Sequence, residues 1–311
     1  MRKSSLSKHL LFTLLLSFSF LTHAGTTYSH VFIFGDSLSD TGNLGSVIGG
    51  IPAPYYKNRI SNGPIAVDLL TEKMGLNANA SLYLLGLNAG DNYSVAGAKA
   101  SSVDPIDLDA QILAFQSNHG FTAPADALYV IFIGGNDVRA ALYEPDDVIA
   151  KAIIQTAMDK VKNAVNILNQ MGARSFLMIN VPDIGSIPET RLVATATGNP
   201  ALIKRATKFT KRYNKKLHKL TEKIEHKDNI EITEFDLRKL FASVFENATV
   251  TGFTNTTDAC FSSMTFTFHP DCNYGLNADQ FVFFDEIHPT KRVHAIFGEA
   301  FYKALNNEDD E

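Results

Sequence analysis

The stretch His30-Val31-Phe32-Ile33-Phe34-Gly35-Asp36-Ser37 decides the fold, because a short apolar run there stops abruptly at Gly-Asp-Ser. A run of β-branched and aromatic residues that ends in a turn signal is typical of a strand buried on both faces. In open α/β sheets, ligands bind outside the carboxyl ends of the strands. Ser37 therefore has two interpretations at this point: a serine in an ordinary turn, or a nucleophile at the ligand-binding end of a sheet.

Beyond this stretch, the chain alternates apolar strand-like runs with helical periodicity. Further strands are expected at residues 91–98, 127–133, 175–181 and 230–235. Helices are expected at residues 64–75, 106–118, 145–171, 200–226 and 290–305. This alternation predicts an α/β fold with a mainly parallel, five-stranded sheet covered by helices on both faces.

The N-terminal residues have the composition of a targeting segment. Three basic residues precede an apolar run at residues 10–21, and small residues follow up to Ala24. This pattern predicts a signal peptide at residues 1–24, cleaved after Ala24, and therefore a secreted or periplasmic protein. An uncleaved anchor is the alternative. Residues 25–311 contain no Pro-, Gly- or Ser-rich linker, so we expect one domain.

The net charge restricts the partners. The 311-residue chain has a formal net charge of −5, which becomes −8 when a leader with three basic residues is removed. Nucleic-acid binding needs a basic surface, so we expect no nucleic-acid partner. The same charge argues against tight electrostatic docking on an anionic membrane. Any contact with a membrane surface is therefore expected to be transient.

The chain has two cysteines, Cys260 and Cys272, both in the exported part. In an oxidising compartment such a pair usually forms a disulfide, whereas zinc binding would need further ligands at suitable spacing. The surrounding segment, at about 249–284, interrupts the alternation and is expected to be an inserted loop stapled by this disulfide. Its phenylalanines have two interpretations: the wall of an acyl groove, or a small core of the loop itself. They are Phe253, Phe261, Phe266 and Phe268.

Polar residues of complementary chemistry follow several expected strands and the inserted loop. Serine needs a base to take its proton, and histidine has a suitable pKa, so His288 is the candidate base for Ser37. Asp285 lies three residues before His288 and can hold its imidazole in the correct tautomer. The backbone N–H groups of Ser37 and Gly97 and the side-chain amide of Asn136 are candidate donors to an oxyanion. Because the carboxyl ends of parallel strands meet at one edge of the sheet, these residues can converge.

These residues stand in blocks that resemble the GDSL, or SGNH, family of lipases and esterases. The blocks are Phe34–Asn43, Asn92–Ala98, Gly134–Asp137 and Asp285–Thr290. The resemblance runs from about residue 30 to 305. It implies a flavodoxin-like, three-layer α/β/α sandwich and a triad of Ser37, His288 and Asp285. It also implies an oxyanion hole of Ser37, Gly97 and Asn136, with no metal or organic cofactor.

Within the family, the chain looks most similar to the secreted bacterial branch that includes lysophospholipase A and glycerophospholipid:cholesterol acyltransferase. The long connection after Ser37, the residues Ser61-Asn62-Gly63-Pro64 and the late cysteine loop carry this resemblance. It implies a lysophospholipid or phospholipid substrate, with cholesterol as an alternative acyl acceptor. This branch is activated by proteolytic nicking in such a loop, so an activating protease is a further expected partner.

Three other classes of function compete with this interpretation. A metallophosphoesterase would need Asp-x-His or His-x-His patterns, and the sequence has neither. A periplasmic binding protein usually has two domains around a cleft, and gives no reason for Ser37 and His288 to fall in their blocks. A carbohydrate or small-ester esterase would use the same residues, and the sequence separates it poorly from a lipid hydrolase.

Overall fold

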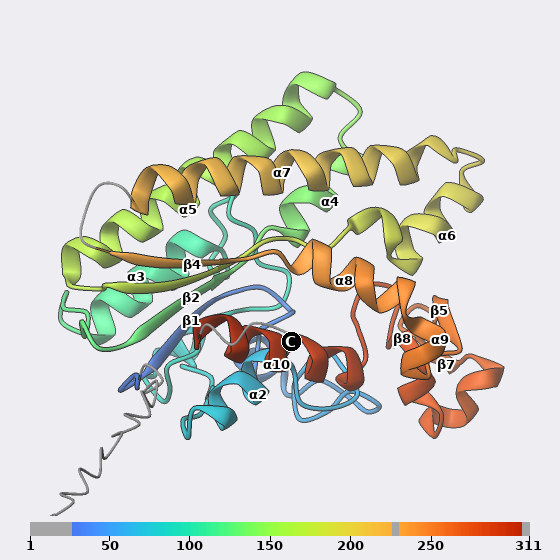
Figure 1. The fold of residues 1–311 in the computed structure, drawn as a ribbon, viewed down its shortest axis with the longest axis horizontal. Coiled ribbons are helices and arrows are strands. Elements are labelled where there is room, and N and C mark those ends of the chain that lie inside the picture. The colour runs from blue at the N-terminus through green and yellow to red at the C-terminus, as the bar shows by residue number, and fades with distance from the viewer. Residues whose placement is uncertain (1–26, 226–229, 307–311) are drawn as a thin grey trace, which may run out of the picture.

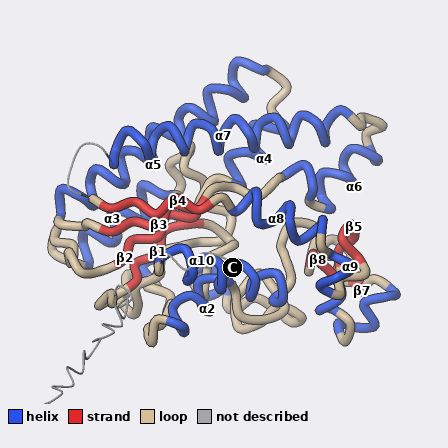
Figure 2. The backbone as a smooth tube through the Cα atoms, viewed as in Figure 1, coloured by secondary structure: helices blue, strands red, loops and turns tan. Residues whose placement is uncertain are grey.

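The computed structural model describes residues 27–225 and 230–306, so the predicted signal peptide lies outside the described residues. Its centre is a parallel sheet of four strands in the order β1-β2-β3-β4 (Figure 2). The strands are β1 (Val31–Gly35), β2 (Leu128–Phe132), β3 (Ser175–Ile179) and β4 (Glu231–Phe235). Val31 lies opposite Leu128, so the carboxyl ends of β1 and β2 finish together at Gly35 and Phe132.

Helices cover both faces of this sheet and make the predicted three layers. They are α1 (Asn43–Ile48), α2 (Ala66–Lys73), α3 (Leu108–Asn118), α4 (Gly135–Tyr143), α5 (Asp147–Met171), α6 (Pro188–Ala196), α7 (Ala201–Glu225), α8 (Leu237–Glu246), α9 (Ala248–Thr251) and α10 (Lys291–Leu305). Figure 1 shows α5 and α7 on one face and α2 and α10 on the other. The five expected helices are confirmed as α2, α3, α5, α7 and α10. No helix among the described residues combines the length and apolarity that crossing a bilayer requires.

Aromatic side chains join the sheet to both helical layers. On one face, Phe32 and Phe34 of β1 contact Phe115 of α3, with ring centroids 4.9 and 5.6 Å apart. On the other face, Phe132 of β2 meets Phe301 of α10 at 6.1 Å. Burying a phenylalanine of this kind contributes about 1.5–3 kcal/mol. Strands β1, β2 and β3 are therefore apolar at consecutive positions, because both faces are covered.

The prediction of a fifth strand at residues 91–98 is wrong, because only Asn92 forms a bridge to β1, at Ile33. The ladder begins correctly, since the N–H of Tyr93 donates to the Ile33 carbonyl over 2.7 Å. It becomes irregular at Gly35, whose carbonyl accepts from the N–H of Val95 over 3.2 Å but whose own N–H donates to the side-chain oxygen of Gln111 over 2.9 Å. The amide of Gln111 in turn donates to the Gly35 carbonyl over 2.8 Å. When this segment is counted, the strand order is still the flavodoxin-like 2-1-3-4-5.

The segment at 249–284 contains two small sheets and a disulfide between Cys260 and Cys272. Its strands are β5 (Asn255–Ala259), β6 (Phe261–Ser262), β7 (Thr267–Phe268) and β8 (Phe281–Phe283), with β5 pairing with β8 and β6 with β7. Figure 1 shows this segment beside α8 and α9, apart from the main sheet. Buried Phe261, Phe281 and Phe284 pack around the two half-cystines as a second, small core.

Candidate active site

Ser37, His288 and Asp285 lie in one hydrogen-bonded line. Ser37 follows β1 directly, and its Oγ is 2.8 Å from His288 Nε2. The Nδ1 of His288 lies 2.8 and 2.9 Å from the two carboxylate oxygens of Asp285. In the tautomer with a proton on Nδ1, the imidazole donates to Asp285 and accepts from the Ser37 hydroxyl. This is the geometry that a serine nucleophile and its base require.

The turn after β8 holds the buried carboxylate of Asp285 in its charged form. The backbone N–H groups of Ile287 and His288 donate to Asp285 Oδ1 over 2.8 and 2.7 Å. Burial on its own raises the pKa of Asp285, but the His288 imidazole and these backbone donors outweigh it and hold the pKa below its usual value. The carboxylate is therefore available to stabilise a protonated His288.

Asn136 lies at the start of α4, which the sequence analysis did not predict. Its amide Nδ2 donates to the Ala98 carbonyl over 3.0 Å. The guanidinium of Arg139, one helical turn later, donates to Asn136 Oδ1 over 3.1 Å and forms an ion pair with Glu189. This chain of bonds fixes the orientation of the amide, and leaves its second N–H for an oxyanion.

Gly97 lies at an exposed turn beside Ala98, with φ of 89°, a left-handed conformation that favours glycine. Two carboxylates outside the triad hold this turn from both sides. Asp40 accepts from the N–H of Ala96 over 2.8 Å, and Asp137 accepts from the N–H groups of residues 100 and 101 over 3.0 and 2.7 Å. Gly97 is thereby tied to the stretch that follows Ser37 and to Asn136 through the neighbouring residues.

An apolar cavity of about 40 Å³ opens beside Ser37 and His288. Side chains from the loop after β3, from α8 and from α10 supply its walls. The lining residues are Asp36, Ser37, Leu38, Gly135, Asn136, Arg139, Pro182, Ile184, Ile187, Phe241, Ile287, His288, Pro289 and Phe297. Gly97 is not among them. The four loop phenylalanines are also absent, and Phe261 and Phe268 belong instead to the small disulfide core.

Asp36 is buried beside the cavity, directly before the serine. Its Oδ1 accepts from the N–H of Leu38 over 3.1 Å, so it braces the turn as an Asx motif does. Burial raises the pKa of Asp36 to about 6, although His288 and the Leu38 N–H oppose this rise. Asp36 is therefore a structural neighbour of Ser37 that shapes the turn.

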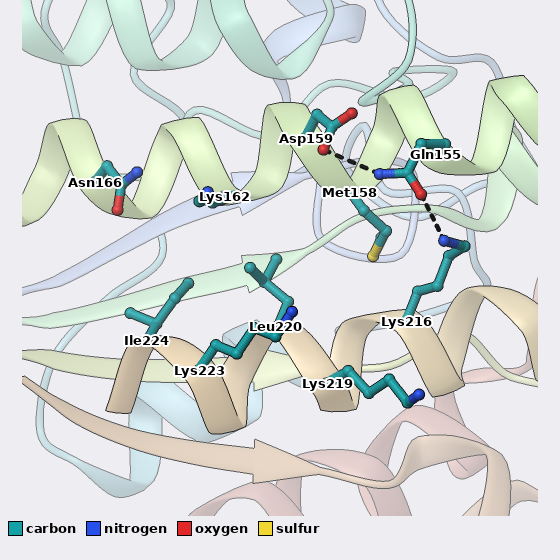
Figure 3. Close-up of a pocket in the computed structure, with 10 residues that line it drawn as sticks. All are labelled: Gln155, Met158, Asp159, Lys162, Asn166, Lys216, Lys219, Leu220, Lys223 and Ile224. Atoms are coloured by element: carbon teal, nitrogen blue, oxygen red, sulfur yellow. Dashed lines mark hydrogen bonds between the residues drawn. The ribbon is translucent and has the colours of Figure 1, made fainter. Parts of the chain in front are cut away.

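A larger hollow, of about 510 Å³, lies between α5 and α7, and none of the residues of the triad lines it. Figure 3 shows four lysines around it: Lys162, Lys216, Lys219 and Lys223. Lys216 donates to Gln155 Oε1 over 2.5 Å. The lysine-rich face of α7 is a solvated helix surface, as its charge pattern predicts.

Three residues of the site were missed by sequence reasoning: Tyr55, Arg139 and Glu189. The Tyr55 hydroxyl donates to Asp285 Oδ2 over 2.8 Å, from 230 residues away in the sequence. No local spacing predicts such a contact. Arg139 could have been found, because it lies three residues after Asn136 and a helix there places both side chains on one face. Within residues 27–225 and 230–306, no three His, Cys, Asp or Glu side chains are grouped as metal ligands.

A family model described as GDSL-like lipase/acylhydrolase matches residues 31–301. The chain belongs to this family. It is 26% identical to the phosphatidylcholine-sterol acyltransferase of Aeromonas hydrophila, over 88% of each protein. It is also 26% identical to Lipase 1 of Photorhabdus luminescens, where the match covers 94% of this chain but only 52% of that protein. A catalytic mutant of an acetylxylan esterase from Geobacillus stearothermophilus aligns with a TM-score of 0.48 and 12% identity, covering 90% of this chain and 95% of that one. This GDSL protein is a hydrolase of carboxylic acyl esters.

Proposed function

We propose that this GDSL protein is a secreted serine esterase that cleaves acyl esters of lipids, with lysophospholipids as preferred substrates. The observation that carries the proposal is the apolar cavity next to the Ser37 hydroxyl, walled by Ile184, Ile187, Phe241 and Phe297. Apolar side chains beside a nucleophile favour a hydrocarbon acyl group over a sugar. The similarity to a phosphatidylcholine-sterol acyltransferase supports the same substrate class.

In the proposed mechanism, His288 Nε2 takes the hydroxyl proton as Ser37 Oγ attacks the acyl carbonyl. The charge that develops on the carbonyl oxygen is met by the N–H groups of Ser37 and Gly97 and by the amide of Asn136. The protonated His288, stabilised by Asp285, then gives its proton to the departing alcohol, which leaves an acyl group on Ser37. Water, activated in turn by His288, releases the fatty acid.

Transfer of the acyl group to an alcohol belongs to the same proposal, because any hydroxyl that replaces water gives a new ester. The Aeromonas hydrophila relative is named for transfer to a sterol, so cholesterol is the proposed alternative acceptor. Export after cleavage at Ala24, and a single hydrolase unit over residues 25–311, complete the proposal. Activation by a protease that cuts between Cys260 and Cys272 is part of it too, since the disulfide would keep both cut ends in place.

A short-chain esterase is the second candidate, and the cavity size favours it. Pockets that enclose whole ligands usually have volumes of roughly 300–1,000 Å³, whereas this cavity measures about 40 Å³. An acetyl group fits such a space, and a long acyl chain needs a path between α8 and α10 or across the surface. A carbohydrate acetyl ester would then be the natural substrate.

The deciding experiment compares release of fatty acid from lysophosphatidylcholine with hydrolysis of p-nitrophenyl esters from two to sixteen carbons. We expect activity on lysophosphatidylcholine and a preference for longer chains, and complete loss in Ser37→Ala with an unchanged circular dichroism spectrum. A Ser37→Ala protein with near wild-type activity contradicts the assignment of the nucleophile. Activity on acetyl esters alone favours the short-chain candidate.

A further inference from the structure

Tyr55 contacts Asp285 from outside the four sequence blocks that contain the proposed catalytic residues. It lies in the long connection between β1 and α2, and its hydroxyl donates to Asp285 Oδ2 over 2.8 Å. Among the described residues, every other donor to the Asp285 side chain belongs to Ile287 or His288 of the same turn. Tyr55 is therefore the one external support of this carboxylate within the part of the chain that the structure describes.

The ring of Tyr55 is held by the disulfide core. It stands edge-on to Phe261 and Phe284, with centroids 5.9 and 5.3 Å away and interplanar angles of 90° and 85°. Phe261 follows Cys260 directly, and Phe284 precedes Asp285 directly. Aromatic pairs in this arrangement add about 0.5–1.5 kcal/mol beyond the area they bury. The position of the Tyr55 hydroxyl thus depends on a core that the disulfide closes.

Backbone bonds tie the same core to the turn that carries Asp285 and His288. The N–H groups of Cys260 and Phe261 donate to the carbonyls of Phe283 and Phe284 over 3.1 and 2.8 Å. The Ser263 hydroxyl donates to the side chain of Glu286 over 2.6 Å. The disulfide segment therefore borders the triad on two sides: through the backbone before Asp285, and through Tyr55.

We propose that Tyr55 is a positioning residue that fixes the Asp285 carboxylate against His288, and that the disulfide segment acts on the triad through it. The proposal rests on the proposed roles of Ser37, His288 and Asp285. His288 Nδ1 lies almost equally far from both oxygens of Asp285, and the two backbone donors reach only Oδ1, so Tyr55 supplies the donor that holds Oδ2 from outside the turn. A hydroxyl donor on Oδ2 leaves Oδ1 to the backbone and keeps the carboxylate plane aligned as His288 gains its proton.

The phenol is suited to this task over the working pH range. Burial, with the nearby Asp285 charge, raises the pKa of Tyr55 well above its ordinary value, so the hydroxyl keeps its proton and remains a donor. A donor to an ionised group makes one of the stronger hydrogen bonds in proteins. Its loss should have its largest effect when the imidazolium forms, which happens as His288 takes a proton from Ser37 and again as it takes one from water.

The first test removes only the hydroxyl. Tyr55→Phe should lower kcat for a p-nitrophenyl ester by about 10- to 100-fold at unchanged KM, because the lost bond supports the transition state and not substrate binding. Tyr129→Phe is the matched control, since its hydroxyl donates over the same 2.8 Å to the Pro124 carbonyl at the other end of the sheet. A wild-type kcat in Tyr55→Phe, or an equal loss in Tyr129→Phe, overturns the proposal.

The second test is a double-mutant cycle with the disulfide. Cys260→Ser combined with Cys272→Ser should lower kcat in the wild-type background, and lower it by a clearly smaller factor in Tyr55→Phe, since the part of the loss that passes through the Tyr55 hydroxyl is already gone there. Fully multiplicative losses overturn the link to the disulfide. If the serine variant does not fold, as a lost thermal transition would show, Tyr55→Phe alone decides.

Active-site labelling separates this proposal from the proposed nucleophile. A fluorophosphonate should label Tyr55→Phe to the same final stoichiometry as wild type but 10- to 100-fold more slowly. Ser37→Ala should not be labelled at all. Labelling of Ser37→Ala contradicts the nucleophile, whereas fast labelling of Tyr55→Phe contradicts the positioning role.

Discussion

Two turns meet at the site, and each carries one buried aspartate beside a functional side chain. Asp36 precedes Ser37 after β1, and Asp285 precedes His288 by three residues after β8. Both carboxylates are 3% exposed. The pKa of Asp36 is raised by burial to about 6, whereas that of Asp285 is lowered by His288 and the backbone donors that outweigh its burial. Equal burial thus accompanies opposite pKa shifts, because the His288 imidazole is bonded directly to Asp285, whereas Asp36 lies farther from it and close to the charge of Asp137.

The difference also concerns where each turn is anchored. The Asp36 turn continues a strand of the main sheet, which is fixed by its neighbours on both faces. The Asp285 turn is bonded to the small disulfide core and lies outside that sheet. Ser37 is therefore supported by the main sheet, whereas the turn of Asp285 and His288 is also bonded to the small disulfide core, so variants in that core test the second turn more than the first.

The largest expected effect comes from removing the charge of Asp285. Asp285→Asn should lower kcat by about 10⁴-fold, because the amide no longer holds the imidazole in the tautomer that can take the Ser37 proton. Hydrolysis of a p-nitrophenyl ester measures this. The adjacent Glu286→Gln is the control, since that side chain bonds Ser263. We expect it to lose less than tenfold, and similar losses in both variants would contradict the choice of Asp285.

A smaller loss of kcat is expected from a change beside Ser37. Asn136→Ala removes one oxyanion donor beside Ser37 and should lower kcat by about 100- to 1,000-fold. Steady-state kinetics on the same ester measure it, with thermal unfolding to show that the fold is retained. A variant that keeps kcat but raises KM would indicate that Asn136 binds substrate and does not stabilise the oxyanion.

The smallest expected effect concerns stability and its dependence on pH. A folded-state pKa of about 6 against an ordinary 3.8 means that the folded chain holds the proton more tightly. The Asp36 charge therefore costs stability above pH 6, and this cost fades as the pH falls toward 4. Asp36→Asn should raise the free energy of unfolding by about 2–3 kcal/mol at pH 8 and change it little at pH 4. Urea denaturation at the two pH values measures this, and an equal gain at both would contradict the cause.

Local sequence patterns were sufficient for the elements that form the main core. The apolar runs at β1, β2 and β3 are short and uninterrupted, as strands covered on both faces must be, whereas the edge strand β4 mixes polar and apolar residues. Long amphipathic periods likewise predicted α5 and α7. The residues of the proposed triad could be predicted from the sequence because each directly follows a strand or stands in a recognisable block.

Side-chain insertions and distant contacts escaped prediction. The side chain of Gln111 takes the place of a backbone partner at Gly35 of β1. No residue near 91–98 indicates that a glutamine from α3 will form these hydrogen bonds. Helix α4 was hidden because Gly134-Gly135-Asn136 has the composition of a loop. Tyr55 is joined to Asp285 by tertiary packing alone, so neither its own neighbours nor those of Asp285 indicate the contact.

The insertion of Gln111 also has a consequence for solubility. An unpaired strand flank can recruit a strand from another molecule, which is a common start of aggregation. Beyond β1, the ladder shrinks to single bridges at Asn92 and then Ala80, whose loops use their own backbone groups locally. A foreign strand would find no regular row of donors and acceptors there. Residues 91–95 and the side chain of Gln111 together therefore occupy the backbone groups of β1 on this side and protect this flank against intermolecular pairing.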